Sequence, residues 1–540
     1  MAASSTSATA PAVKGVARTL AHRRQAVVGF LFALIVILVL HTTVVFGPFQ
    51  STNANVVLES TSGEQNAKTS SPLAAQAASA PNNSTQAAVH AIENGQKDDV
   101  AKNDRETRGQ LGQTGKNDAS DDKTQEELIR QELDRDVKRG APRKPICDLS
   151  DPRYDICEIT GDARAIGANR TVLYVPPADE RGTDGPEWAI KDQSRKQLGD
   201  IKEVNVKTLS AAQSLVAPEC TSRHTVPAVV FSMNGIIGNP WHDLSDLLIP
   251  LFITTRAYDG EVQFLVTELQ PWFMDKYRLV LTNLSRYDII DFNKDAGVRC
   301  YPHIIVGLRS HGDLDIDPAR TPRNYTLLDF RLYIRDVFLL PSDDRGIPYK
   351  EASKKNAASN DNGTAVTENP KPRLLLINRG ESRKFVNLPE VSAAVEAAGF
   401  ELLVMEPSRD MGMEEFARAV DSCDVLMGVH GAALTNFFFL RTNAVLLQVV
   451  GLGLEREALH YYGNQATAVM VQHIQYFISA EESTLYEKYG KDHPAVSDPD
   501  SVHKQGWQGA KRYFWAEQDI RLNVTRFAPT LHQLIRTLQE

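Results

Sequence analysis

The stretch from Asp424 to Leu440, DVLMGVHGAALTNFFFL, combines an apolar strand, a glycine turn and the start of a helix. His430 and Gly431 lie in the turn, and the helix is expected to begin at Ala432. The first N–H groups of a helix have no partner within it, and the helix dipole adds partial positive charge there. Glycine lets backbone approach a ligand, and a histidine ring can donate a hydrogen bond to a phosphate oxygen. The segment therefore predicts an anion site suited to a nucleotide diphosphate.

A second loop, residues 378–387 (NRGESRKFVN), follows the apolar run Arg373–Asn378 and carries three cations. If both apolar runs are parallel strands, the two loops lie at the same edge of one sheet. An arginine there can grip a diphosphate with two parallel hydrogen bonds, although a solvated basic turn would have the same composition. We favour a diphosphate clamp in which Arg383 has the main part. The residues expected to bind the diphosphate are Arg379, Arg383, Lys384, His430, Gly431, Ala432 and Asn436.

A pair of proton-accepting side chains occurs in the segment Asn239–Asp246 (NPWHDLSD). His242 and Asp246 are four residues apart and so share one face of the expected helix. A histidine or a carboxylate is suited to take the proton of an attacking hydroxyl, and a carboxylate beside an imidazole fixes its tautomer. Either His242 or Asp246 is therefore a candidate catalytic base. The structural alternative is a helix cap, for which Asp243 is well suited.

Two acidic segments raise the question of a metal ion. Asp313 and Asp315, extending to Asp317, form one, and Asp498 and Asp500 form the other. An Asp-x-Asp pair can hold a divalent cation against a diphosphate, but Asp-rich loops are also common solvated turns. Because a helix terminus and cationic side chains already face the expected diphosphate, we take both segments as structural and expect no metal and no other cofactor.

The elements that carry these residues have a regular order after residue 370. Short apolar runs alternate with helical segments, which is typical of a parallel sheet covered by helices on both faces. Strands are expected at 373–378, 401–405, 425–427 and 444–450, and helices at 388–398, 413–422 and 432–440. Ligands bind beyond the carboxyl ends of such strands, where both loops described above fall.

The half before residue 340 is less regular but compatible with a second doubly wound lobe that faces the first across a cleft. A strand is expected at 228–232, a helix at 244–254, and further strands at 263–266, 278–281 and 303–306. The polar segment 341–370 contains Pro and Gly and shows no periodicity, which favours a domain boundary. The expected architecture is α/β, with an acceptor-side lobe at 145–340 and a nucleotide-side lobe at 371–540, whose last helix is free to return to the first lobe.

The N-terminal region has the composition of a membrane anchor followed by a stem. Residues 26–46 are almost wholly apolar and uncharged, and at about 1.5 Å per helical residue they can cross a bilayer core of roughly 30 Å. Basic residues precede this span and none follows until Lys68, which places residues 1–25 in the cytosol. A cleaved signal peptide, the alternative, would have a shorter apolar core. Residues 47–144 are polar and poor in aromatics, and are expected to be a disordered lumenal stem.

Sequons and cysteines fit a glycosylating, oxidising lumen. Sequons N-x-S/T occur at Asn82 and Asn83 and, as the expected glycosylation sites, at Asn169, Asn283, Asn324, Asn362 and Asn523. Among the five cysteines, a disulfide between Cys147 and Cys157 is expected, Cys220 and Cys300 are candidates for a second, and Cys423 is expected to be a buried thiol. The net charge of -9 and the lack of a basic stripe argue against a nucleic-acid partner.

At these residues the chain resembles plant members of glycosyltransferase family 61, over roughly residues 147–529. The resemblance rests on five long and jointly specific segments: 147–162 (CDLSDPRYDICEITGD), 239–252 (NPWHDLSDLLIPLF), 378–384 (NRGESRK), 428–436 (GVHGAALTN), and 523–529 (NVTRFAP) with Gly506 and Trp507 before it. It implies a Golgi type II membrane protein with the GT-B fold, in which two Rossmann-like lobes face a cleft. It further implies inverting, metal-independent transfer from a UDP-sugar, which is a co-substrate rather than a cofactor.

The grass-type subgroup that the chain resembles modifies xylan, adding arabinofuranose or xylose to backbone xylosyl units. The leading prediction is a Golgi pentosyltransferase with a lumenal catalytic region, whose partners are a UDP-sugar donor, a xylan acceptor and the Golgi membrane. Xylose transfer to N-glycan cores and a non-catalytic role in a xylan-synthesising complex are the alternatives, and homo- or hetero-oligomerisation is left open. Trp241, Trp507 and Trp515 are candidates for stacking on sugar rings and equally for positions in the core.

Overall fold

The structure, a computed structural model, describes residues 146–183, 185–197, 202–235, 237–343, 371–407 and 412–539. All of them belong to one compact unit, residues 118–540. The predicted cytosolic tail, the anchor at 26–46, the stem at 47–144 and nearly all of the polar segment 341–370 lie outside the described residues. Within the described ranges, no helix is both apolar enough and long enough to span a bilayer.

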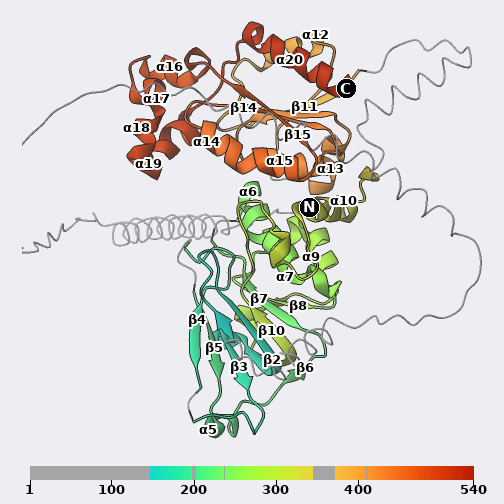
Figure 1. Cartoon of the computed structure of the whole chain (residues 1–540), viewed down its shortest axis with the longest axis vertical. Coiled ribbons are helices and arrows are strands. Elements are labelled where there is room, and N and C mark those ends of the chain that lie inside the picture. The colour runs from blue at the N-terminus through green and yellow to red at the C-terminus, as the bar shows by residue number, and fades with distance from the viewer. Residues whose placement is uncertain are drawn as a thin grey trace, which may run out of the picture. The chain divides into compact units, whose positions relative to one another are not determined.

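The first lobe contains a mixed sheet of ten strands (Figure 1). Its main path has the order β4-β5-β3-β2-β10-β7-β8-β9, with β1 beside β2 and β6 beside β10. The strands are β1 (Cys147–Asp148), β2 (Ile156–Ile166), β3 (Thr171–Val175), β4 (Glu187–Ile190), β5 (Val204–Thr208), β6 (Ser222–Arg223), β7 (Ala228–Ser232), β8 (Gln263–Thr267), β9 (Ile290–Asp291) and β10 (Val298–Val306).

Only part of this sheet matches the doubly wound lobe that the sequence predicts. Strands β10, β7, β8 and β9 run parallel, and β7 and β8 are buried along their whole length. Strand β2, by contrast, pairs antiparallel with both β10 and β3, and its residues mix buried and exposed positions. A sheet with one face in solvent tolerates such strands, which lack the continuous apolar run that marks a buried parallel strand. The antiparallel half therefore escapes prediction from hydrophobic runs.

The helix expected at 244–254 begins earlier and contains a π-helical turn. Asn239 caps its start, since the Asn239 side chain accepts a hydrogen bond from the amide of Trp241 at 3.0 Å. The chain then forms α6 (Pro240–His242), a π-helical turn (Asp243–Leu248) and α7 (Ile249–Thr255) without a break. His242 and Asp246 thus lie where helical geometry changes, a place often associated with function.

The prediction of a strand at 278–281 is wrong, because these residues belong to helix α9 (Arg278–Leu284), which follows α8 (Pro271–Lys276). Val280, Leu281 and Leu284 are buried at helical spacing. A short apolar run such as this one does not distinguish a buried helix from a buried strand.

The second lobe holds a five-stranded, fully parallel sheet in the order β12-β11-β13-β14-β15, with helices on both faces (Figure 1). The strands are β11 (Arg373–Ile377), β12 (Glu401–Met405), β13 (Val425–Val429), β14 (Val445–Val450) and β15 (Gln472–Phe477). The first four confirm the predicted strands; the fifth has the polar sequence QHIQYF and escapes prediction. All five strands point the same way, but β12 lies on one side of β11 whereas β13 and the later strands lie on the other side. The order of the strands thus reverses between β11 and β13, and ligands of doubly wound sheets bind at such a reversal point.

Helices α12 (Leu388–Ala397) and α13 (Met413–Asp421) form where the sequence predicts them, whereas residues 432–439 form a 3₁₀-helix. The C-terminal helix α20 (Val524–Gln539) packs against α12 and so stays with the second lobe instead of returning to the first (Figure 1). Other helical segments are α5 (Ala211–Ser214), α10 (Leu327–Val337), α14 (Glu455–Ala458), a π-helical turn (Leu459–Gly463), α15 (Asn464–Ala468), α16 (Thr484–Tyr489), α17 (Pro494–Ser497), α18 (Pro499–Lys504), α19 (Trp507–Ala510) and a π-helical turn (Lys511–Glu517).

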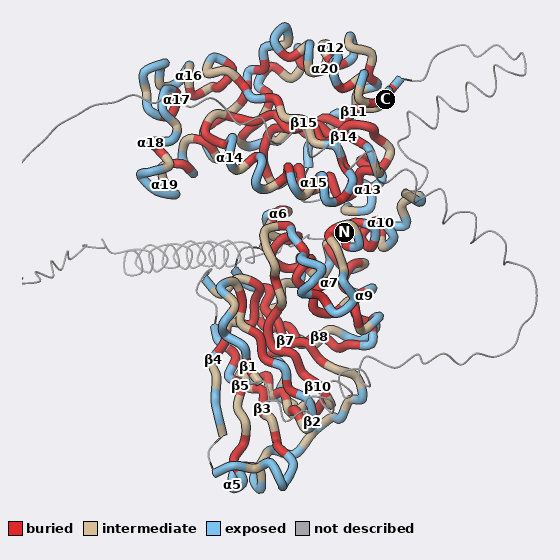
Figure 2. Tube along the Cα trace, viewed as in Figure 1, coloured by how far each residue is buried: buried red, intermediate tan, exposed pale blue. Residues whose placement is uncertain are grey.

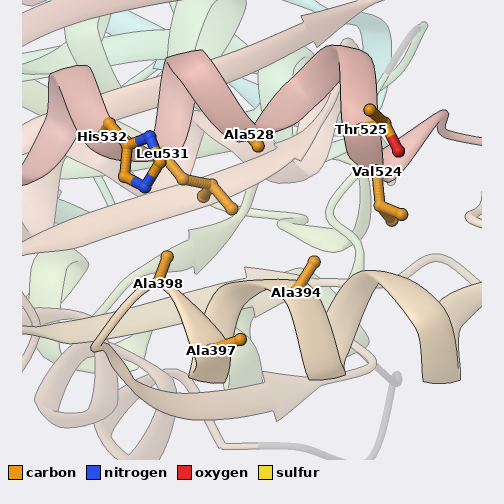
Figure 3. A pocket seen from close by; sticks show the side chains of 8 residues that line it. All are labelled: Ala394, Ala397, Ala398, Val524, Thr525, Ala528, Leu531 and His532. Atoms are coloured by element: carbon orange, nitrogen blue, oxygen red, sulfur yellow. The ribbon is translucent and has the colours of Figure 1, made fainter.

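The hydrophobic core follows the strands, and buried residues run along the sheets of both lobes (Figure 2). A small pocket of about 380 Å³ remains between α12 and α20 (Figure 3). It is lined by short and apolar side chains such as Ala394, Ala398 and Leu531, and no carboxylate or guanidinium lines it.

Helix α10 joins the first lobe to the second. Arg331, which is fully buried, donates from Nε to the carbonyl of Leu440 at 3.2 Å. Arg335 places its Nη2 atom 2.7 Å from Oδ1 of Asp421 and also donates to the carbonyl of Phe439. Both arginines therefore satisfy carbonyls at the end of the 432–439 helix, which carries the predicted anion site at its other end.

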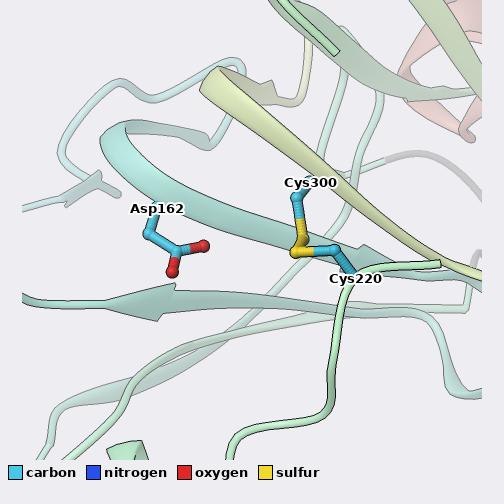
Figure 4. Close-up of side chains that lie close together, drawn as sticks. All are labelled: Asp162, Cys220 and Cys300. Atoms are coloured by element: carbon cyan, nitrogen blue, oxygen red, sulfur yellow. A yellow bond between two sulfur atoms is a disulfide. The ribbon is translucent and has the colours of Figure 1, made fainter. Parts of the chain in front are cut away.

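The structure contains two disulfides, including the expected bond between Cys147 and Cys157. Cys220 and Cys300 form the second, and Cys423 is a free, buried thiol. The carboxylate of Asp162 lies beside the second disulfide (Figure 4), but both sulfur atoms are bonded to one another and Asp162 is ion-paired with a neighbouring arginine. Asp162 and the two cysteines therefore have structural roles.

Candidate functional site

The two loops predicted to hold an anion meet at the reversal point of the second sheet. One follows β11 and carries Arg379 and Arg383, and the other follows β13 and carries His430 and Gly431. Strands β11 and β13 are direct neighbours, with Ile377 beside Gly428. Parallel pairing thus brings together residues about fifty positions apart in sequence.

Both guanidinium groups lie against Gly431. A Cβ atom on Gly431 would be 2.6 Å from Nη1 of Arg379 and 2.8 Å from Nη1 of Arg383, so a larger residue there would displace both guanidinium groups. Arg383 donates from Nη1 to the carbonyl of His430 at 2.9 Å, and Arg379 donates from Nε to the carbonyl of Ser382 at 3.0 Å. The close approach predicted for this turn is therefore between backbone and arginine side chains.

Arg383 is held in an unusual conformation. Its φ angle is +55°, in the left-handed region that costs a non-glycine residue roughly 1 kcal/mol. Its backbone N–H donates to the carbonyl of Gln518 at 3.0 Å, and its guanidinium carbon lies 5.0 Å from the ring centre of Trp515. Burial, with the nearby Arg379 charge, lowers the pKa of Arg383 to about 9, so the group stays charged at neutral pH.

His430 is buried and neutral. Burial, and then the charges of Arg383 and Arg379, lower the pKa of His430 to about 3. The side-chain nitrogen of Gln448 lies 2.6 Å from Nδ1 of His430, and the side-chain oxygen of Gln448 lies 2.8 Å from Nε2 of His473. In this chain of bonds His473 donates to Gln448 and Gln448 donates to His430. The proton of His430 is therefore on Nε2, where it acts as a hydrogen-bond donor.

Several buried donors in this region have no acceptor among the described residues. They are Nε of Arg383, Nε2 of His430, Nε1 of Trp515 and Nε1 of Trp241. No carboxylate of the described residues forms a salt bridge with the buried Arg383 or the half-buried Arg379, although the charge of Glu381 acts on Arg379. Unmet buried donors and uncompensated buried charge are costly. A ligand rich in anionic oxygens would satisfy both, so the arrangement is suited to the predicted diphosphate.

Some of the residues predicted to bind the diphosphate take other positions. The Nζ atom of Lys384 turns back to the carbonyl of Gly380 at 3.4 Å, and Nδ2 of Asn436 donates to the carbonyl of Ala433 at 2.7 Å. Ala432 opens the 3₁₀-helix next to Gly431, so its amide stays at the entrance of the site.

His242 and Asp246 form the predicted pair. Nδ1 of His242 lies 2.6 Å from Oδ2 of Asp246, and Oδ1 of Asp246 accepts a hydrogen bond from Nε of Arg195 at 2.6 Å. The Asp246 side chain is buried, whereas that of His242 is 29% exposed. Because Asp246 is engaged on both oxygens and accepts from Nδ1 of His242, Nε2 of His242 is left as the accessible lone pair. The geometry favours His242 as the proton acceptor and Asp246 as its positioning residue.

An ionic cluster that the sequence did not reveal surrounds this pair. Arg195 and Arg153 both contact Asp313 as well as Asp246, with Nη2 of Arg153 2.8 Å from Oδ1 of Asp313. The carbonyl of Asp313 accepts a hydrogen bond from Gln465 of the second lobe at 3.2 Å. Asp313, considered above as a metal ligand, therefore links the two lobes beside His242.

Aromatic rings connect the His242 pair to the anion site. The ring of Trp241 contacts His242 and Tyr461 edge-on, with centroids 4.9 Å apart in each case. The ring of Tyr461 lies nearly parallel to His430 at 6.4 Å. Two aromatic side chains, Trp241 and Tyr461, thus lie between His242 and His430.

Three π-helical turns within the described residues each carry part of this site. The turn 243–248 carries Asp246, the turn 459–463 carries Tyr461 and Tyr462, and the turn 511–517 carries Trp515. The hydroxyl of Tyr462 donates to the carbonyl of Gly431 at 2.8 Å. Such turns are rare and are often found at functional sites, where they re-aim side chains.

Other candidate residues have local roles. Asp317 and Asp498 cap helical turns, accepting hydrogen bonds from the amides of Ala319 at 3.1 Å and Ser501 at 3.3 Å. The sequon asparagines in the described ranges are exposed, and Asn362 lies outside those ranges; the exposed ones are Asn169, Asn283, Asn324 and Asn523. Their glycosylation stays a prediction, as does the expectation that no metal is used.

Comparison with known proteins connects this site to one family. The family model described as Glycosyltransferase 61 matches residues 241–447, which include His242, Arg383 and His430. An alpha-1,3-arabinosyltransferase of Oryza sativa subsp. japonica (XAT2) is 38% identical over 405 residues, which cover 74% of this chain and 65% of that protein. A beta-1,2-xylosyltransferase of the same plant (XYXT1) is 40% identical over 411 residues, 73% of this chain and 84% of that protein. A xylan glycosyltransferase of Arabidopsis thaliana (MUCI21) is 33% identical over 389 residues, 71% and 78% respectively.

Arg383→Ala should weaken UDP binding by about 10- to 100-fold, because charge-assisted hydrogen bonds to a buried anion are worth about 1.5–3 kcal/mol. Isothermal titration calorimetry of the full chain measures this. Arg521→Ala is the matched control, since Arg521 is half exposed and paired with Glu487. A native melting temperature together with unchanged UDP affinity in the Arg383 variant would rule out the clamp.

The bonds from His473 through Gln448 to His430 predict a pH effect. The natural protein keeps His430 neutral between pH 5 and 8, because its pKa is about 3. Gln448→Glu places a carboxylate on Nδ1 and raises the pKa of His430. UDP affinity relative to the natural protein should then rise as the pH falls from 8 to 5.

Two substitutions of His473 provide the control for this pH experiment. His473→Gln keeps an N–H donor toward Gln448 and should retain the affinity for UDP. His473→Leu lacks this donor and should bind UDP several-fold more weakly. Equal UDP affinity in all these variants at every pH would show that the tautomer of His430 has no part in binding.

Proposed function

The chain is a member of glycosyltransferase family 61, and from this premise we propose that it transfers a pentose from a UDP-sugar to xylosyl units of xylan. The observation that carries the proposal is the set of unpartnered buried donors around Arg383 and His430, next to a histidine–aspartate pair. The unpartnered donors suit a diphosphate leaving group, and the histidine–aspartate pair suits the deprotonation of an attacking hydroxyl.

In the proposed reaction, an acceptor hydroxyl attacks the anomeric carbon of the donor sugar. Its oxygen forms the new glycosidic bond while the bond from the anomeric carbon to the phosphate oxygen breaks. The proton passes to Nε2 of His242, and the electron pair leaves with UDP. Attack from the side opposite UDP inverts the anomeric configuration, in the two-lobed GT-B arrangement that the family resemblance implies.

Charge on the departing UDP is stabilised by Arg383, by Nε2–H of His430 and by the amides at the start of the 432–439 helix. Preorganised donors of this kind contribute roughly 3 kcal/mol each to a transition state. Since two guanidinium groups already supply positive charge there, the proposal includes no metal, and transfer should persist in EDTA. Asp246, fixed by Arg195, holds His242 in the tautomer that accepts the proton.

The donor and the compartment are further parts of the proposal. UDP-arabinofuranose and UDP-xylose share the diphosphate that this site addresses, and the related proteins named above include enzymes of both kinds. The apolar span 26–46 with basic residues before it supports a single-pass type II protein of the Golgi membrane with its catalytic part in the lumen.

A screen of the two donors on xylohexaose, with and without EDTA, tests the function. We expect transfer from one of them, and NMR of the product gives its linkage. Transfer of xylose to an N-glycan acceptor instead would redirect the assignment to N-glycans. UDP binding without transfer to any acceptor would favour a non-catalytic role in a xylan-synthesising complex.

His242→Ala should lower kcat by about 100-fold or more with little change in UDP affinity, because a positioned base contributes typically about 10²–10⁴-fold. Asp246→Asn should also lower kcat, by leaving His242 without its acceptor. Initial rates at saturating donor and a UDP titration measure the two effects. Full turnover in His242→Ala would place the base elsewhere.

A further inference from the structure

A groove of about 630 Å³ lies between helices α8–α9 of the first lobe and α13 of the second. This volume falls within the range of ligand pockets, roughly 300–1,000 Å³. Trp272 on α8 lines it and is 43% exposed, although tryptophan is on average a largely buried residue. None of the residues used above for the base or for the diphosphate lines it.

In each sheet, the residues that line the groove follow the strand next to the one that leads to the site. His242 follows β7, and Trp272 follows β8, the parallel neighbour of β7. Arg383 follows β11, and α13 follows β12, the parallel neighbour of β11. Both walls of the groove therefore begin at the carboxyl edges where the site itself is built.

One wall is also fastened to the helix that carries His242. Nζ of Lys276 lies 3.1 Å from Oδ2 of Asp243, the residue after His242, and the hydroxyl of Tyr277 donates to the same oxygen at 2.7 Å. The ring of Trp272 is 3.8 Å from where a Cβ of Gly238 would lie, just before the start of that helix. A ligand in the groove would thus be held at a fixed position relative to the base.

The chemistry of the lining suits an uncharged, hydroxyl-rich chain. Three acidic and three basic side chains face the groove, so they sum to no net charge: Asp275, Glu414, Glu415, Lys276, Arg278 and Arg418. A polyanion would be attracted by an excess of cations, which is lacking. Sugar hydroxyls can bond to either sign of charge, and the flat indole of Trp272 offers a surface for the apolar face of a pyranose ring.

We propose that this groove binds the acceptor polysaccharide, holding backbone sugar units beyond the one that receives the pentose. The inference rests on the proposed function for its choice of xylan as the chain. It makes Trp272 a residue that determines the preferred acceptor length, outside the group that carries out transfer. Long acceptors reach the groove, whereas the shortest ones occupy only the region near His242.

The test compares binding and transfer for xylobiose and xylohexaose in the full-length protein with UDP present. Trp272→Ala should weaken xylohexaose binding and raise its KM about 5- to 10-fold, through loss of the aromatic surface. The kcat and KM for xylobiose should stay within twofold of the natural values. Trp272→Tyr should restore most of the xylohexaose affinity.

Leu215→Ala is the control, because Leu215 is 81% exposed, follows the short helix α5 and does not line the groove. Unchanged xylohexaose binding in Trp272→Ala, or an equal loss for both acceptors, would overturn the inference. Loss of xylohexaose binding in Trp272→Ala, in a protein that transfers no pentose to xylan, would uphold the groove while contradicting the proposed function.

Discussion

Two guanidinium groups without a carboxylate partner, packed around one glycine, are the feature on which the site depends. Burying charge is costly unless it is paired, and no carboxylate of the described residues forms a salt bridge with Arg379 or Arg383, although the charge of Glu381 acts on Arg379. The fold holds them together because β11 and β13 are neighbours at the reversal point of the sheet and because Gly431 has no side chain. A diphosphate would supply the missing negative charge.

The site combines a charged hydrogen-bond donor, Arg383, with a neutral donor, His430. Arg383 supplies charge, and its left-handed backbone, its bond to Gln518 and its contact with Trp515 determine where that charge points. His430 is an uncharged donor of fixed orientation, because burial keeps the ring neutral and the hydrogen bond with Gln448 fixes the proton on Nε2. On the other side, Arg195 and Arg153 contact Asp246 as well as Asp313, and Asp246 contacts His242. Trp241 and Tyr461 set the separation of the two halves.

Much of the second lobe could be predicted from sequence, since its strands are continuous apolar runs and its two functional loops follow them directly. The pairing of His242 with Asp246 also follows from helical spacing. The antiparallel half of the first lobe could not be predicted, because strands such as β2 mix exposed and buried residues. Arg153 and Arg195 reach Asp246 from about ninety and fifty positions away, and no local pattern reports such contacts. Gln448 was visible as a lone polar residue within VLLQVV, a signal that could have been used.

A structure of the protein with bound UDP tests the central claim most directly. The account predicts phosphate oxygens within hydrogen-bonding distance of Nε of Arg383 and Nε2 of His430, next to Gly431, with the open side of the β-phosphate toward His242. UDP bound elsewhere, with these donors still unpartnered, would contradict it.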